Sequence, residues 1–296
     1  MNERPKLSII TTVLNGERFM AGCLRNVIDQ RCDGLEHLVV DGASTDHTVD
    51  IVKQFAGRYA HIRWISEKDK GQNHAMNKGL RLAQGTIVGF LNVDDFYEPG
   101  VLNRILKIFE PLEEPVFLAG NCNVWNDEGR IRSVCRPNRL KFKDLLLGYE
   151  ICPHPVNPSS YFYHLSLHEK AGWYDEDNVC NGDLDFILRA VRYARVMYRD
   201  ELWGNFRCIQ GTKTYRNMIT TGTQVFDRPI LERYRRMLPF VQRIHVYTVL
   251  TIYRIRFAFF AVIKNVLRAA VSLGRSRKEC SGGSGFFFHK RHRAWP

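Results

Sequence analysis

Short apolar runs alternate with longer amphipathic segments over the first 110 residues of the chain. The runs are rich in β-branched residues, which is typical of buried strands, whereas apolar residues in the longer segments recur at three- and four-residue spacing, which predicts helices. The predicted strands cover residues 7–13, 36–40, 61–65 and 86–91, and the predicted helices cover residues 17–30, 45–56, 73–83 and 99–109. Strands and helices in this order predict an α/β fold with a Rossmann-like, mainly parallel sheet flanked by helices.

Positive charge is concentrated at the C-terminal end. Residues 228–296 contain 15 Lys and Arg against 2 Asp and Glu, a net charge of +13, whereas residues 1–227 contain 28 against 29 and carry −1. The basic character therefore belongs to the tail. We expect one folded domain over residues 1–227, a basic amphipathic helical segment over 228–280 and a flexible basic end over 281–296.

Cysteine spacing and the N-terminal residues bear on the compartment. The eight cysteines form no C-x-x-C pair and no cluster at zinc-ligand spacing, which indicates reduced thiols of a cytosolic protein. No apolar signal region follows the first positive charges. We therefore expect a cytoplasmic protein.

Acidic residues follow three of the predicted strands. Asp41 comes directly after the second, Asp69 lies in the segment after the third, and Asp94 and Asp95 follow the fourth. Because the carboxyl ends of parallel strands meet at one edge of a sheet, we expect these carboxylates to line one crevice. Hard oxygen ligands at such an edge suit a divalent ion that holds phosphate oxygens. The alternatives are an Asx turn at Asp41 and a turn or helix cap at the aspartate pair.

These three loops resemble the nucleotide-sugar-binding half of family 2 glycosyltransferases. The motifs that carry the resemblance lie in residues 39–48, 67–79 and 91–96, and a weaker similarity continues over residues 150–200. The resemblance implies a GT-A fold, a nucleoside diphosphate sugar as donor, Mn²⁺ or Mg²⁺ as cofactor and a hydroxyl of a surface polysaccharide or lipid-linked glycan as acceptor. The chain departs from the family pattern at His74, where relatives carry Asp, and at Gly182.

The same resemblance assigns roles to residues of the first half. The implied donor contacts are Thr12, Asn15, Asp41, Asp69, Gly71, Asn77 and Asp94. Asp95 is the predicted direct metal ligand, and Asp94 would reach a ribose or sugar hydroxyl. The ion would stabilise the negative charge that develops on the diphosphate leaving group.

Asp183 is the predicted catalytic base. It precedes apolar residues at helical spacing, so it should lie at a helix N-terminus, where its alternative role is that of a cap. The family's base matches Asp183, which would take the proton of the acceptor hydroxyl in a single inverting displacement. Asp185, two residues on, is predicted to stabilise the first helical turn.

The resemblance also suggests two acceptor-site residues. His154 matches a histidine that relatives place at the edge of this site, and Trp173 could stack on a sugar face. A structural role for His154 and core packing for Trp173 are the alternatives.

The tail has its own pattern. Residues 241–271 are largely apolar and aromatic, but cationic residues interrupt them so often that no stretch is long enough to span a bilayer. A basic helix of this kind is typical of peripheral contact with an anionic membrane, here the inner face of the cell membrane. The alternative is a helical element that packs on the core or at a dimer contact.

Three other functions are alternatives for this chain. A nucleic-acid-binding protein would need basic groups on its core, and the core is neutral, so we expect no nucleic-acid partner. A nucleotidyltransferase would carry a basic, glycine-rich phosphate loop after the first strand, and residues 12–16 contain no Lys or Arg. A non-catalytic scaffolding relative is favoured only by departures such as Gly182 and His74.

Overall fold

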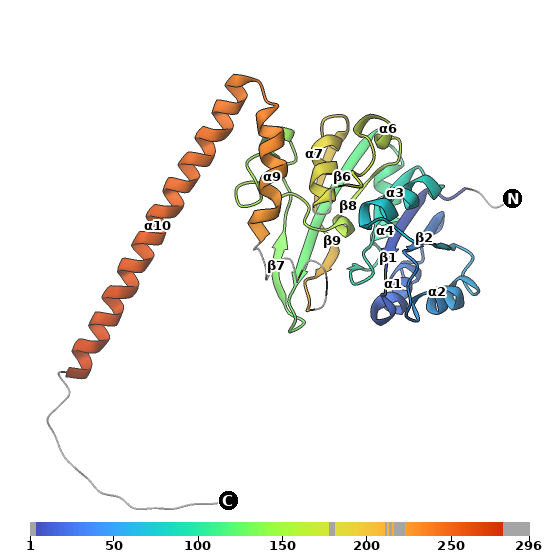
Figure 1. Cartoon of the computed structure of the whole chain (residues 1–296), viewed down its shortest axis with the longest axis horizontal. Coiled ribbons are helices and arrows are strands. Elements are labelled where there is room, and N and C mark those ends of the chain that lie inside the picture. The colour runs from blue at the N-terminus through green and yellow to red at the C-terminus, as the bar shows by residue number, and fades with distance from the viewer. Residues whose placement is uncertain (1–3, 178–180, 211, 213–214, 216–222, 281–296) are drawn as a thin grey trace, which may run out of the picture. The chain divides into compact units, whose positions relative to one another are not determined.

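One sheet organises the first part of the chain in the computed structural model, which describes residues 4–177, 181–210, 212, 215 and 223–280 (Figure 1). Its strands run in the order β3-β2-β1-β4-β8-β6-β9-β5, and β7 pairs with β6. The strands are β1 (Leu7–Val13), β2 (Leu35–Asp41), β3 (Ile62–Ser66), β4 (Ile87–Phe90), β5 (Phe96–Tyr97), β6 (Val116–Trp125), β7 (Ile131–Cys135), β8 (Tyr161–His164) and β9 (Arg195–Arg207).

Strand direction divides the sheet into two parts. Strands β1 to β4 are parallel to one another, and β1 pairs with β2 from Leu7 opposite Leu35 to Val13 opposite Asp41. Strand β8 is antiparallel to both β4 and β6, and β9 returns parallel to β6. The parallel part confirms the α/β prediction and brings the loops after β1, β2, β3 and β4 to one edge.

Helices cover both faces of the sheet. The helices of the described residues are α1 (Glu17–Ile28), α2 (Thr48–Ala56), α3 (Gln72–Leu82), α4 (Val101–Phe109), α5 (Phe142–Leu145), α6 (Leu167–Ala171), α7 (Gly182–Ala190) and α9 (Thr223–Arg236), with a 3-10 turn at Pro158–Ser160. A further helix, α10 (Phe240–Cys280), lies mostly in a second unit of the chain. The four helices that the periodicity predicts in the first half are all present, with ends that differ by a few residues.

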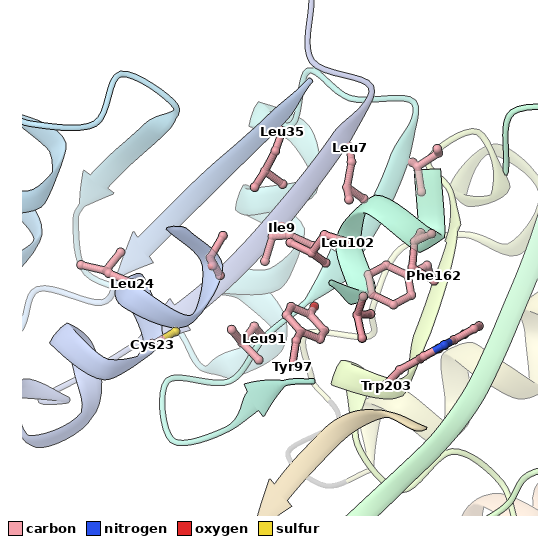
Figure 2. Packing of buried hydrophobic residues seen from close by; sticks show 14 of the residues in the cluster. Leu7, Ile9, Cys23, Leu24, Leu35, Leu91, Tyr97, Leu102, Phe162 and Trp203 are labelled. Carbon is pink, nitrogen blue, oxygen red and sulfur yellow. The ribbon is translucent and has the colours of Figure 1, made fainter. Parts of the chain in front are cut away.

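The main core lies between the sheet and helices α1 and α4. Figure 2 shows Leu7 and Ile9 of β1 facing Leu24 and Leu102 of these helices, and all four side chains are fully buried. On the opposite face α3 approaches β1 so closely that a Cβ at Gly79 would lie 2.5 Å from Ile10 Cγ2. Buried apolar surface of this extent is the main stabilising contribution to the fold.

The first compact unit extends past the predicted boundary at residue 227. The first compact unit extends to Val246, and the second comprises residues 247–296. Helix α9 belongs to the first unit because Leu231 and Tyr234 are buried there, and because the buried Arg235 donates to the carbonyl of Leu146. The cationic residues of α9 do not form a free tail, since Arg233 and Tyr234 bind Asp185 of α7.

Candidate active site

The loop after β4 holds two aspartates in different environments. Asp95 is 1 % exposed, and its carboxylate accepts hydrogen bonds from Asn92 Nδ2 (2.9 Å), Asn157 Nδ2 (2.7 Å) and the backbone N–H of Arg207 (2.8 Å). Burial, and then the neighbouring charge of Asp94, raise the pKa of Asp95 to about 7. Asp94 is only partly buried.

This arrangement bears on the prediction that Asp95 is the direct metal ligand, which stays a prediction. Three donors from three chain segments hold its carboxylate inside the protein, so Asp95 fixes the shape of the loop. Asp94 is the carboxylate that remains near the surface. Burial raises the pKa of Asp94 also. A positive charge bound nearby would stabilise the ionised form of both carboxyl groups.

Arg207 supplies one cation at this loop. It ends β9, its side chain donates from Nε to the carbonyl of Asp94, and its guanidinium lies 5.4 Å from the ring centre of Phe19 and 5.5 Å from that of Phe96. The sequence analysis missed Arg207 because β5 pairs with β9 across more than 100 residues. An Arg at the end of a strand-like run is the weak signal that could have suggested it.

The loops after β1 and β2 are bound to each other. Asn15 accepts from the N–H of Thr45 (2.9 Å) and its own N–H donates to Ser44 Oγ (2.8 Å). Asp41 accepts from the N–H of Ser44 (3.0 Å), from the Ser44 hydroxyl and from Ser66 Oγ (2.7 Å). These bonds agree with the turn alternative for Asp41, and its donor contact stays a prediction.

Thr12 keeps a partly exposed position near the end of β1. It has the same strand parity as Ile10, so it faces the side of the sheet that α3 covers. Gly16, just beyond β1, packs under the β4 loop, because a Cβ there would lie 3.3 Å from Val93 Cγ2. Thr12 and the Asp94 loop therefore border the same sheet edge.

The loop after β3 contains an ion-paired cluster. Lys78 of α3 lies 2.6 Å from Asp69 Oδ1 and 2.8 Å from Glu67 Oε1, and His74 Nδ1 lies 3.0 Å from Asp69 Oδ1. Hydrogen bonds and charge from Asp69 and Glu67 raise the pKa of Lys78 against the opposing effect of burial. The departure at His74 thus has a structural reason, since the imidazole helps hold Asp69. Gly71 has open space where a side chain would be.

Asn77 is not at the surface that a donor could reach. It is 1 % exposed, its Oδ1 accepts from the N–H of Tyr174 (3.0 Å), and its Nδ2 donates to the carbonyl of Tyr174 (2.9 Å) and to Glu176 Oε1 (2.9 Å). These bonds tie α3 to the turn before α7. These bonds give Asn77 a structural role, and the donor contact stays a prediction.

Asp183 lies in the first turn of α7, partly exposed. The hydroxyl of Tyr161 on β8 donates to its Oδ1 at 3.1 Å. The N-terminus of α7 packs on α3, because a Cβ at Gly182 would lie 2.5 Å from Asn73 Oδ1. The space that the family's first acidic residue would use is thus filled by Asn73.

Asp185 differs from its prediction. It is buried, and it binds Arg189 Nε (3.0 Å), the Tyr234 hydroxyl (3.0 Å) and the guanidinium of Arg233. Asp185 therefore joins α7 to α9 rather than only stabilising its own helical turn.

The two predicted acceptor-site residues have opposite exposures. His154 is 8 % exposed, packs edge-on to Tyr149 at 5.3 Å, and burial lowers its pKa to about 4. This buried position agrees with the structural alternative for His154, and the acceptor contact stays a prediction. Trp173 is 42 % exposed, with its ring stacked on His168 at 5.2 Å and the Arg81 guanidinium 5.0 Å from the ring centre. Part of the side chain is therefore open to solvent.

The chain matches a known protein family and several known proteins. The family model described as "Glycosyl transferase family 2" matches residues 8–163. The chain is 28% identical over 151 residues to the uncharacterized glycosyltransferase YibD of Escherichia coli, an alignment that covers 50% of this chain and 43% of YibD. The chain thus spans less than half of that relative.

Solved structures show the same fold. S. aureus TarS in complex with UDP-GlcNAc is 18% identical, with a TM-score of 0.58 over 71% of this chain and 60% of that one. The mannosyltransferase PcManGT from Pyrobaculum calidifontis, in complex with GDP-Man and Mn²⁺, is 20% identical, with a TM-score of 0.54 over 92% of this chain and 81% of that one. These likenesses confirm the predicted GT-A architecture.

Proposed function

The chain belongs to glycosyl transferase family 2, and from that premise we propose that it transfers a sugar, with inversion, from a nucleoside diphosphate sugar to a hydroxyl of a surface polysaccharide or lipid-linked glycan. The observation that carries this proposal is the loop after β4, where the buried Asp95 fixes the backbone and leaves Asp94 beside the cation of Arg207. A diphosphate needs positive charge at such a point when its bond to the sugar breaks.

Donor binding is assigned to the edge of the parallel strands. Thr12, Asp69 and Gly71 border it and are proposed to contact the nucleotide, while Asp41 and Asn15 shape the loops behind it through their hydrogen bonds. The neighbours' titles name UDP-GlcNAc and GDP-Man as bound donors, which supports a nucleotide sugar here without choosing between bases.

The residues at Asp94 fit a divalent cation, Mn²⁺ or Mg²⁺. A hard carboxylate oxygen is the ligand such ions prefer, and they are often held by one or two carboxylates together with substrate phosphates. The raised pKa of both Asp94 and Asp95 indicates a site that a nearby positive charge would relieve. When bound, the ion would act as a Lewis acid toward the leaving diphosphate. A neighbouring structure contains Mn²⁺.

Asp183 is proposed as the general base. From the N-terminus of α7 its carboxylate would accept the proton of the acceptor hydroxyl as that oxygen attacks the anomeric carbon and the diphosphate departs. Trp173, exposed beside the turn that leads to α7, is proposed to stack on the acceptor sugar.

Donor hydrolysis by the purified protein tests the proposal. A panel of UDP- and GDP-sugars would be incubated with Mn²⁺, with Mg²⁺ and with EDTA, and release of the nucleoside diphosphate would be measured. We expect one donor to be consumed in a metal-dependent reaction that Asp183→Asn slows strongly. If no nucleotide sugar is bound or consumed under any condition, the non-catalytic alternative is correct.

We also propose peripheral contact with the cytoplasmic face of an anionic membrane through α10. Apolar side chains are exposed along this helix, among them Phe240, Val241, Ile255 and Phe259, in a segment that is also rich in cations. Within the described residues, no helix has both the length and the apolar character required to cross a bilayer. Each Lys or Arg near an anionic leaflet contributes about 1 kcal/mol to adsorption.

Truncation after Val246 tests this contact, because that residue ends the first compact unit. The truncated protein should lose most of its binding to liposomes that contain phosphatidylserine and keep donor hydrolysis. Full-length protein should bind neutral liposomes weakly and release from anionic ones as salt increases. Equal binding by both proteins would favour a packing or dimer role for α10.

A further inference from the structure

Two tyrosines on β8 have nearly the same surroundings. Tyr161 and Tyr163 are both fully buried, point to the same face of the strand, and stack on Phe117 with ring centres 5.3 and 6.3 Å away. Their hydroxyl groups differ in their partners. Tyr161 donates to Asp183 Oδ1 at 3.1 Å, whereas the hydroxyl of Tyr163 lies 3.0 Å from His168 Nε2.

The direction of each hydrogen bond follows from protonation. Burial, and then the charge of Asp183, raise the pKa of Tyr161 well above its ordinary value, so its hydroxyl remains a donor. Burial lowers the pKa of His168 to about 4, and its Nδ1 lies 3.0 Å from the carbonyl oxygen of Gly172. The neutral imidazole therefore carries its proton on Nδ1 and accepts from Tyr163 at Nε2.

We propose that Tyr161 is a positioning residue for the reaction: its hydroxyl fixes the plane of the Asp183 carboxylate and stabilises the ionised form that accepts a proton. This inference rests on the proposed function, in which Asp183 is the base. Because Tyr161 stands on a central strand between β4 and β6, its hydroxyl is held as rigidly as the sheet. A donor on so rigid an element restricts the carboxylate more than solvent would.

Three buried phenols lie close enough to Asp183 to sense its charge. The titratable groups that sense its charge are the phenols of Tyr161, Tyr163 and Tyr174, which burial keeps protonated. Asp185 on the same helix faces Arg189 and Arg233. Tyr161 is therefore the group on β8 whose removal should change the titration of Asp183 most.

The experiment compares Tyr161→Phe with Tyr163→Phe, which removes a neighbouring buried hydroxyl of the same strand. The rate of hydrolysis of the nucleotide sugar that the wild type consumes would be measured from pH 5 to 9, together with affinity for the nucleoside diphosphate and the melting temperature. In Tyr161→Phe we expect the acid limb of the rate profile to move up by roughly one to two pH units, with nucleotide affinity unchanged. Tyr163→Phe should keep the wild-type profile.

A second probe leaves the buried ring and hydroxyl in place, so its result does not depend on whether Tyr161→Phe folds. Incorporation of 3-fluorotyrosine at position 161 retains the ring and the hydroxyl but makes it a stronger hydrogen-bond donor, so the acid limb should move down. If this variant and Tyr161→Phe both keep the wild-type limb while Asp183→Asn is inactive, the role of Tyr161 is wrong and the proposed base survives. If Asp183→Asn retains full activity, the proposed function of Asp183 fails instead.

Discussion

Two pairs of aspartates, one in the loop after β4 and one at the start of α7, each combine a partly exposed carboxylate with a buried one. In the loop, Asp94 is partly exposed and Asp95 is enclosed by Asn92, Asn157 and Arg207. In the helix, Asp183 is partly exposed and Asp185 is enclosed. The buried carboxylate of each pair binds groups from other segments of the chain. These bonds fix the backbone, and so the position, of the partly exposed carboxylate. Chemistry at either point is therefore assigned by exposure rather than by residue type.

The two buried aspartates, Asp95 and Asp185, differ in the groups that surround them. Asn and backbone N–H donors surround Asp95, and burial leaves its pKa near 7, whereas Asp185 is paired with two arginines. A carboxylate held by neutral donors remains sensitive to a nearby cation, while one paired with arginine does not. The β4 loop is thus the region in which a divalent ion would have the larger electrostatic effect.

The largest expected effect separates Asp183 from Asp185. Asp183→Asn should lower the transfer rate by roughly 10²- to 10⁴-fold with nearly unchanged nucleotide affinity, because it removes only the proton acceptor. Asp185→Asn should instead lower the free energy of unfolding by about 2 kcal/mol, through loss of charged hydrogen bonds to α9. Rate and melting temperature measured on both variants test the division, and a rate loss confined to Asp185→Asn would reverse it.

A similar pair of variants tests the β4 loop. Asp94→Ala should reduce Mn²⁺-dependent donor turnover by roughly 10²- to 10³-fold at unchanged stability, since it removes the partly exposed carboxylate that is proposed to bind the ion. Asp95→Ala should destabilise the protein by about 1–3 kcal/mol, because it leaves buried donors without an acceptor. Should Asp95→Ala abolish Mn²⁺ binding while its melting temperature stays normal, the original assignment from sequence would be right.

Asn77→Ala should act on stability alone. Its side chain clamps α3 to the backbone of Tyr174, so we expect a loss of about 1–3 kcal/mol in the free energy of unfolding and little change in nucleotide affinity. Chemical denaturation and nucleotide titration would measure the two quantities. Asn103→Ala, on the remote α4, is a control for amide loss near the surface; a tenfold loss of affinity in Asn77→Ala only would restore the donor contact.

A smaller effect concerns pH. Burial, with a contribution from His61, lowers the pKa of His37 to about 3, and its Nε2 lies 2.9 Å from Thr11 Oγ1. Below pH 6.5 His37 binds a proton in the unfolded chain but stays neutral in the folded one. The free energy of unfolding should therefore fall as the pH drops from 6.5 toward 3. The contribution is about 1.4 kcal/mol per pH unit. His37→Gln should flatten the wild-type slope by that amount in denaturation at pH 5 to 7, and an unchanged slope would contradict it.

Much of the first half follows from sequence alone. The alternation of β-branched runs with periodic amphipathic segments predicts β1 to β4 and the helices between them, because each element there buries one face against its neighbours in chain order. The acidic residues at the strand ends are also predictable, since parallel strands bring their carboxyl ends together. The motifs of residues 39–48, 67–79 and 91–96 were sufficient to identify the family.

Only the tertiary structure decided which of these side chains face outward. Asp95 is internal because β9 brings the N–H of Arg207 to it from 112 residues away, and Asp185 is internal because α9 folds back over α7. Tyr161 and Tyr163 have the same place in the alternation of β8, yet only one hydroxyl meets Asp183. Local periodicity describes how each segment buries its own apolar face, whereas the exposure of a polar group depends on which distant segment packs over it.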